Sequence, residues 1–192
     1  MKKKIALLIG LAALLVLIIG AYILYDKYSE EYQPDNLGSQ QSADSSAEEP
    51  TDIDYSAPDF TVLDSNMNPV SLSDLFGKPI EVTFWASWCP NCLTEMPHFE
   101  EAYKKYGDEI HFVMLNATDG ERETLARAQA LIEKSGYTFP VYYDTTMEAS
   151  ITYYTTALPM TFFINADGDL VASGTGSLDP ESLQRGIDMI LP

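Results

Sequence analysis

The sequence contains few cysteines, few histidines and few basic residues. Its 192 residues include two cysteines and two histidines, and 11 Lys and Arg stand against 29 Asp and Glu, for a formal charge of −18. Two cysteines exclude a framework of several disulfides. A structural zinc site is disfavoured, because zinc usually takes four Cys or His ligands. The acidic balance disfavours binding to nucleic acid or anionic lipid, since both carry negative charge.

The longest apolar run lies near the N-terminus. It extends from Ile5 to Tyr25 and follows three lysines at positions 2–4. At ~1.5 Å rise per residue such a helix spans a hydrocarbon core of ~30 Å. We therefore predict a cytoplasmic lysine cluster and a transmembrane anchor in residues 1–25, with the rest of the chain outside the cytoplasm by the positive-inside rule. The alternative, a cleaved signal peptide, has an apolar region of only about 7–15 residues.

The segment after the anchor differs in composition from the rest of the chain. Residues 26–55 are rich in Ser, Gln, Asp and Glu and contain few large apolar side chains. Such a segment buries too little surface to offset the entropy of ordering, so we predict a flexible acidic linker. The remaining residues, 56–192, have the length of one globular domain.

Within this domain, strand-like and helical patterns alternate. The order predicts an α/β fold with a mixed central sheet flanked by helices on both faces. A turn is expected at residues 166–169, and a short helix is expected to be capped by Ser71 or Ser73. Strands are predicted in 56–64, 80–86, 110–117, 139–144 and twice within 160–174, and helices in 90–107, 121–135, 145–156 and 180–191.

Both cysteines lie in the stretch FWASWCPNC, residues 84–92. A disulfide between Cys89 and Cys92 closes a four-residue loop, for which chain entropy predicts about 2 kcal/mol of stabilisation, against ~4.7 for a 100-residue loop. The chain contains no second cysteine pair to complete a zinc site. A redox-active pair is therefore favoured over a structural disulfide and over a metal site.

The residues around the pair also favour redox chemistry. If a helix begins after Cys89, this residue is the N-cap, Pro90 occupies the first helical position, and Cys92 lies one turn inside. A helix N-terminus favours a thiolate. We therefore predict that Cys89 attacks and that Cys92 resolves the mixed disulfide.

Several motifs together carry a family resemblance. FWASWCPNC resembles the active site of thioredoxins, and APDFTVLD, VSLSDLFGKP, WCPNCLTEMP, YTFPVYYD and LPMTFFINADGDLVASGTG resemble, in this order, membrane-tethered TlpA/ResA-type thiol-disulfide oxidoreductases. The match covers nearly all of residues 56–192. It implies a thioredoxin-like fold with an N-terminal strand extension and an inserted helix at residues 121–135. It also implies a redox-active Cys89–Cys92 disulfide, with no other cofactor and no metal.

The resemblance assigns further site residues. Pro159 matches the proline that is cis in thioredoxins and faces the cysteines, and it would present the Leu158 backbone to an extended substrate. Glu95 matches a carboxylate just after the pair and is a candidate acceptor for the Cys92 proton. As an alternative, Glu95 is a solvated helix residue.

Residues adjacent to the cysteines complete the candidate site. Trp88 is expected to shield the disulfide and to offer substrate a flat apolar surface, whereas Trp85 is expected in the core. Pro90 and Asn91, between the cysteines, are expected to contact substrate, and they tune the reduction potential in this family.

The sequence departs from thioredoxin at one position. Thioredoxin has a buried aspartate six residues before its first cysteine, where this chain has Thr83. Glu81 lies on the same face of the predicted strand, because side chains alternate along a strand. We expect Glu81 or Glu95 to act as the proton acceptor instead.

The resemblance also implies a cellular role. It predicts an extracytoplasmic enzyme, held at the cell membrane by one helix, that reduces disulfides of exported client proteins. A transmembrane thiol carrier of the CcdA/DsbD type would supply electrons. The alternatives are an oxidant that introduces disulfides, a thiol peroxidase and a metal chaperone. APDFTVLD also resembles peroxiredoxins, but Ala86 replaces the threonine of their T-x-x-C motif.

Overall fold

The computed structural model describes residues 37–39 and 55–192. The predicted anchor, residues 1–25, and most of the predicted linker lie outside the described residues. Within the described ranges, no helix combines the length and the apolar character needed to cross a membrane.

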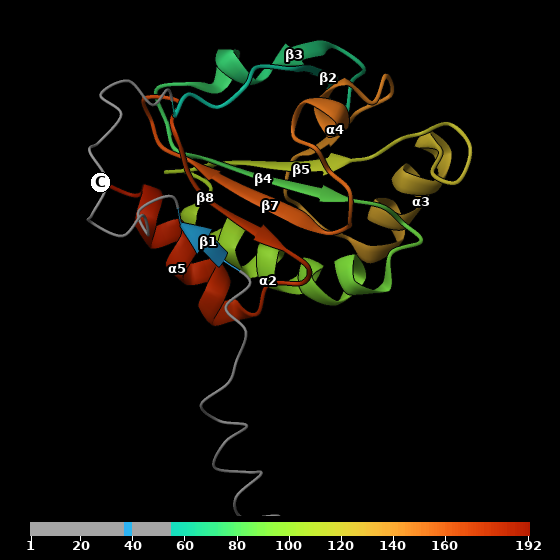
Figure 1. The fold of residues 1–192 in the computed structure, drawn as a ribbon. Helices are drawn as coiled ribbons and strands as arrows, with labels where there is room; N and C mark the ends of the chain where they lie inside the picture. The colour runs from blue at the N-terminus through green and yellow to red at the C-terminus, as the bar shows by residue number, and fades with distance from the viewer. Residues whose placement is uncertain (1–36, 40–54) are drawn as a thin grey trace, which may run out of the picture. The chain divides into compact units, whose positions relative to one another are not determined.

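A mixed β-sheet forms the centre of the domain. Among the described residues it has eight strands in the order β1-β8-β7-β4-β5-β6-β2-β3 (Figure 1). The central strand β4 pairs in parallel with β5 and antiparallel with β7. The mixed sheet is thus confirmed. The strands are β1 (Leu37–Ser39), β2 (Thr61–Leu63), β3 (Pro69–Ser71), β4 (Ile80–Trp85), β5 (His111–Asn116), β6 (Val141–Tyr143), β7 (Met160–Ile164) and β8 (Leu170–Thr175).

Strand β4 is central because of its composition. Its sequence, IEVTFW, is rich in β-branched and aromatic residues, and all six residues are buried. A strand that is buried on both faces shows a nearly continuous apolar run, as here. Glu81 and Thr83 are the two polar exceptions, and both are fully buried.

Helices cover the two faces of the sheet. In Figure 1, α2 and α5 lie on one side of the strands, and α4 lies on the other side together with the β2–β3 hairpin. One apolar cluster includes residues of α2, α3 and α5, and a second includes residues of η1 and α4. The helices are η1 (Leu72–Leu75), α2 (Pro90–Tyr106), α3 (Leu125–Ser135), α4 (Glu148–Thr152) and α5 (Pro180–Ile190).

Several element boundaries differ from the sequence prediction. The inserted helix begins at Leu125 rather than at residue 121, because residues 119–123 form a loop whose amides bind the Asp119 carboxylate. The segment predicted as helix over 145–156 is helical only at Glu148–Thr152. Of the two proposed caps for the short helix, the structure has Ser71.

The strand β1 was not expected. Leu37–Ser39 falls within the segment predicted as a linker, yet it pairs antiparallel with β8. An edge strand leaves a row of backbone N–H and C=O groups unpaired, and any nearby extended segment can satisfy them. This pairing depends on the backbone, so the polar composition of the segment gave no sign of it.

Candidate active site

The two cysteines lie where β4 leads into α2. Trp85 ends the strand, and a turn follows in which the Cys89 amide donates to the Ala86 carbonyl at 3.1 Å. Cys89 is the N-cap of α2, and Pro90 occupies the first helical turn, as the sequence indicated. The proline fits there because the first N–H groups of a helix have no partner within it.

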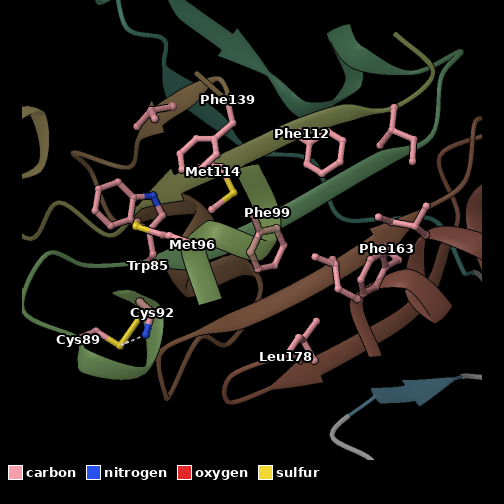
Figure 2. Packing of buried hydrophobic residues seen from close by; sticks show 14 of the residues in the cluster. Trp85, Cys89, Cys92, Met96, Phe99, Phe112, Met114, Phe139, Phe163 and Leu178 are labelled. Carbon is pink, nitrogen blue, oxygen red and sulfur yellow. Dashed lines mark hydrogen bonds between the residues drawn. A yellow bond between two sulfur atoms is a disulfide. The ribbon is translucent and has the colours of Figure 1, made fainter. Parts of the chain in front are cut away.

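Cys89 and Cys92 form a disulfide, with 5.3 Å between their Cα atoms. The Cys92 amide donates to Sγ of Cys89 at 3.2 Å, shown as the dashed line in Figure 2. Cys89 retains 4% of its surface exposed, whereas Cys92 has none. Of the two cysteines, Cys89 is therefore the more exposed, and it lies at the positive end of the helix.

Apolar side chains pack around the disulfide from the interior. Trp85, Met96 and Phe99 belong to the same buried cluster as both cysteines (Figure 2). Trp85 is fully buried, as expected, and Trp88 is 37% exposed. The pair thus belongs to the buried core on its inner side, and its outer side borders the surface.

Glu95 is buried on α2, one turn beyond Cys92. Its side chain is 1% exposed, and its Oε2 accepts a hydrogen bond from the Leu178 amide at 2.8 Å. Oε1 has no hydrogen-bond partner among the described residues. Burial raises the pKa of Glu95 to about 8, although the Leu178 amide acts in the opposite direction. The interpretation of Glu95 as a solvated residue is therefore wrong.

Glu81 is a second buried carboxylate, on β4. The Thr83 hydroxyl donates to Oε1 of Glu81, and this contact places the two side chains on one face of the strand, as predicted. The Thr83 hydroxyl also lies 2.9 Å from that of Thr161. Burial raises the pKa of Glu81 well above its usual range, and the charge of Glu95 raises it further.

The peptide bond between Leu158 and Pro159 is cis, as the resemblance implied. Pro159 directly precedes β7, and its carbonyl accepts from the Gly176 amide at 2.9 Å. Leu158 and Trp88 line the same groove, whose volume is about 220 Å³. The groove therefore brings together Leu158 and Trp88, two of the predicted substrate-contacting residues.

Pro90 and Asn91 are both exposed at the start of α2. The Asn91 carbonyl faces the Ser177 hydroxyl at 3.4 Å. The predicted substrate-contacting residues therefore reach the surface on the outer side of the disulfide.

Two residues near the site were not identified as site residues from the sequence. Arg122 and Glu123 were placed inside the predicted inserted helix, where charged residues normally face solvent. In the structure the Arg122 guanidinium lies over the Trp88 ring, and Glu123 is fully buried beneath the turn that carries Ser87. A charge pattern within one segment gives no signal for such contacts, because the partners lie more than 30 positions away.

The chain is similar to known proteins. The model of the AhpC/TSA family matches residues 53–173. A thiol-disulfide oxidoreductase ResA from Geobacillus kaustophilus is 31% identical over 196 residues, with all of both chains covered. The ResA of Bacillus subtilis is 30% identical over 194 residues, with 100% of this chain and 97% of that protein covered.

A solved structure is similar as well. The exposed lipoprotein thioredoxin of Streptococcus pneumoniae strain TIGR4 is 26% identical and has a TM-score of 0.61. The match covers 68% of this chain and 98% of that one.

Proposed function

Because the chain belongs to the AhpC/TSA family and is a thiol-disulfide oxidoreductase of the ResA type, we propose that it reduces disulfides of exported client proteins outside the cytoplasm. The main support is the position of Cys89, whose sulfur caps α2 beside a fully buried Cys92. This arrangement favours attack by one sulfur and resolution by the other.

In the first step the Cys89 thiolate attacks a client disulfide. The sulfur–sulfur bond of the client breaks, a mixed disulfide forms, and the released client thiolate takes up a proton. The N-terminus of α2 stabilises the attacking thiolate through its free amides. Trp88, Pro90, Asn91 and the Leu158 backbone would contact the client segment, and the cis Pro159 would hold that segment in an extended form.

In the second step Cys92 resolves the mixed disulfide. Its thiol loses a proton, the thiolate attacks Sγ of Cys89, and the second client thiol leaves. Two electrons and two protons have then moved to the client, and the Cys89–Cys92 disulfide has formed. Cys92 is fully buried, so bulk water is a poor proton acceptor and an internal base is needed.

Glu95 fits the role of this base better than Glu81. A thiol has an ordinary pKa of about 8.5, and proton transfer is efficient between groups of similar pKa. The pKa of Glu95 is raised to about 8, close to that of a thiol. Glu95 also lies on the helix of Cys92, whereas Glu81 lies on β4, where burial and the charge of Glu95 raise its pKa well above its usual range.

The proposed cellular setting comes from the sequence outside the described residues. The apolar run in residues 1–25 would anchor the chain in the cell membrane, and residues 26–55 would link it to the catalytic domain. The similar pneumococcal protein is described as an exposed lipoprotein, which agrees with a domain outside the cytoplasm. A transmembrane thiol carrier of the CcdA/DsbD type would then return electrons to the disulfide.

The proposal is tested by measuring the reduction potential of the Cys89–Cys92 pair, which decides whether the protein reduces or oxidises its clients. The full-length protein is equilibrated with dithiothreitol buffers, and the reduced fraction of the pair is quantified by alkylation. A reduction potential below about −250 mV supports a reductant, whereas a value near −120 mV supports the alternative of a disulfide-introducing oxidant. Consumption of hydrogen peroxide by the reduced protein would instead favour the thiol peroxidase.

A further inference from the structure

The loop that precedes α3 is fixed by its own contacts. Oδ1 of Asp119 accepts from the amides of Glu121 and Glu123, each at 2.8 Å. The Gly120 amide donates to the Glu123 carbonyl at 2.9 Å, with a φ of +80° at this glycine. Arg122 and Glu123 then lie directly before the N-cap of α3 in a defined position.

Glu123 connects this loop to the segment that carries Cys89. Its Oε2 accepts from both the amide and the hydroxyl of Ser87, at 3.0 and 2.7 Å. Its Oε1 accepts from the Asn116 side chain at 3.1 Å. The side chain is fully buried, and a buried carboxylate is costly unless its oxygens accept hydrogen bonds, as both do here.

Arg122 contacts Trp88, the residue that follows Ser87 in that segment. Its guanidinium carbon lies 3.3 Å from the centre of the Trp88 ring, within the range of a cation–π interaction. Ser87 and Trp88 are the two central residues of the turn that the Cys89 amide closes on Ala86. One loop therefore holds both central residues of the turn that ends at the attacking cysteine.

We propose that Glu123 is a positioning residue for thiol-disulfide exchange. Through Ser87 it fixes the turn at residues 86–89, and so it fixes the place of Cys89 at the N-terminus of α2. Arg122 assists by holding Trp88. A displacement of about 1 Å in a reacting group can cost up to about 100-fold in rate, so a fixed turn matters for attack. The inference rests on disulfide exchange at Cys89 and does not depend on its direction.

The chain provides a matched control. Glu100 on α2 accepts from the amide and the hydroxyl of Thr138, each at 2.8 Å, and lies eight positions beyond Cys92. The variants Glu123→Gln and Glu100→Gln of the full-length protein are compared for the midpoint of thermal unfolding and for kcat and KM with a peptide disulfide. We expect Glu123→Gln to lower kcat about tenfold with KM changed less than about twofold. Glu100→Gln should change kcat by less than about twofold, even if its midpoint of thermal unfolding falls as far as that of Glu123→Gln.

A second variant tests the inference in case Glu123→Gln does not fold. Ser87→Ala removes the hydroxyl contact to Glu123 but keeps the amide contact, and it should lower kcat about threefold. The inference is overturned if Glu123→Gln and Glu100→Gln lose kcat equally, or if kcat of a folded Glu123→Gln is unchanged. Should Glu123→Gln fail to fold, an unchanged kcat in Ser87→Ala overturns it. A wild-type protein that exchanges no disulfide with dithiothreitol overturns the proposed function as well.

Discussion

The Leu178 amide donates a hydrogen bond to Oε2 of Glu95, at 2.8 Å, and so joins the segment before α5 to the helix that carries the cysteines. This contact explains why a buried carboxylate persists one turn beyond Cys92. The other carboxyl oxygen, Oε1, has no hydrogen-bond partner among the described residues. Glu95 is therefore held in place while one of its oxygens stays available for a proton.

The first prediction concerns stability and pH. The pKa of Glu95 is raised from 4.5 to about 8 in the folded protein, so the folded state binds more protons than the unfolded state between these values. Stability from this group is therefore lost as the pH rises from about 4.5 to about 8. In Glu95→Gln this loss is absent. Between pH 5 and pH 8 the free energy of unfolding of wild type should fall by about 3 kcal/mol more than that of Glu95→Gln, since each pKa unit corresponds to about 1.4 kcal/mol.

Urea unfolding of the oxidised protein at both pH values measures this difference. The control is Glu101→Gln, which alters an exposed carboxylate on the same helix. Equal pH dependence in wild type and Glu95→Gln would contradict the raised pKa.

The second prediction separates the two buried carboxylates in catalysis. If Glu95 accepts the Cys92 proton, Glu95→Gln should slow resolution of a mixed disulfide on Cys89 about 100-fold near pH 7. Glu81→Gln should have a smaller effect, below about fivefold, because Glu81 lies on β4 and not on the helix that carries Cys92. The rate is measured by mixing the reduced protein with a disulfide of a fluorescent thiol and following its two-step release. Unchanged resolution in both variants at every pH would remove both carboxylates from the mechanism.

Local signals in the sequence were sufficient for much of the fold. Cys89 followed by Pro90 marked the start of α2, and α5 has the same local pattern, with Asp179 as its N-cap and Pro180 at its first position. Gly136 ends α3 in the left-handed conformation, directly after the predicted last residue of that helix. Each of these signals acts within a few residues, so the sequence contains the full cause.

Other features depend on distant partners and could not be predicted. The sequence placed Glu81 on the correct face of its strand, but burial of both its carboxylate and that of Glu95 required the packed helices. The start of α3 was misplaced because the Asp119 side chain binds two following amides and holds a loop. The burial of Glu123 depends on Ser87, which lies 36 positions earlier.

A third prediction concerns the tight packing of Gly186 against Phe163 in the core. An added Cβ on Gly186 of α5 would lie 2.2 Å from Cζ of Phe163, a ring that is fully buried on β7. Alanine is favoured over glycine in a helix by about 1 kcal/mol, but overpacking costs about 1–3 kcal/mol or more. Gly186→Ala should therefore destabilise the protein by about 2 kcal/mol, measured by urea unfolding. The additional change Phe163→Leu should recover part of the loss, and a more stable Gly186→Ala would contradict the packing.

The fourth prediction assigns roles to the two sulfurs. Cys92→Ala leaves a Cys89 that can attack but cannot be resolved, so mixed disulfides with clients should accumulate in cells. Cys89→Ala leaves only a fully buried sulfur, so it should accumulate few. The species are separated by non-reducing electrophoresis and identified after reduction, with the double variant as the background. Accumulation in Cys89→Ala at the level of Cys92→Ala would reverse the roles, because the fully buried sulfur would then be the one that clients reach.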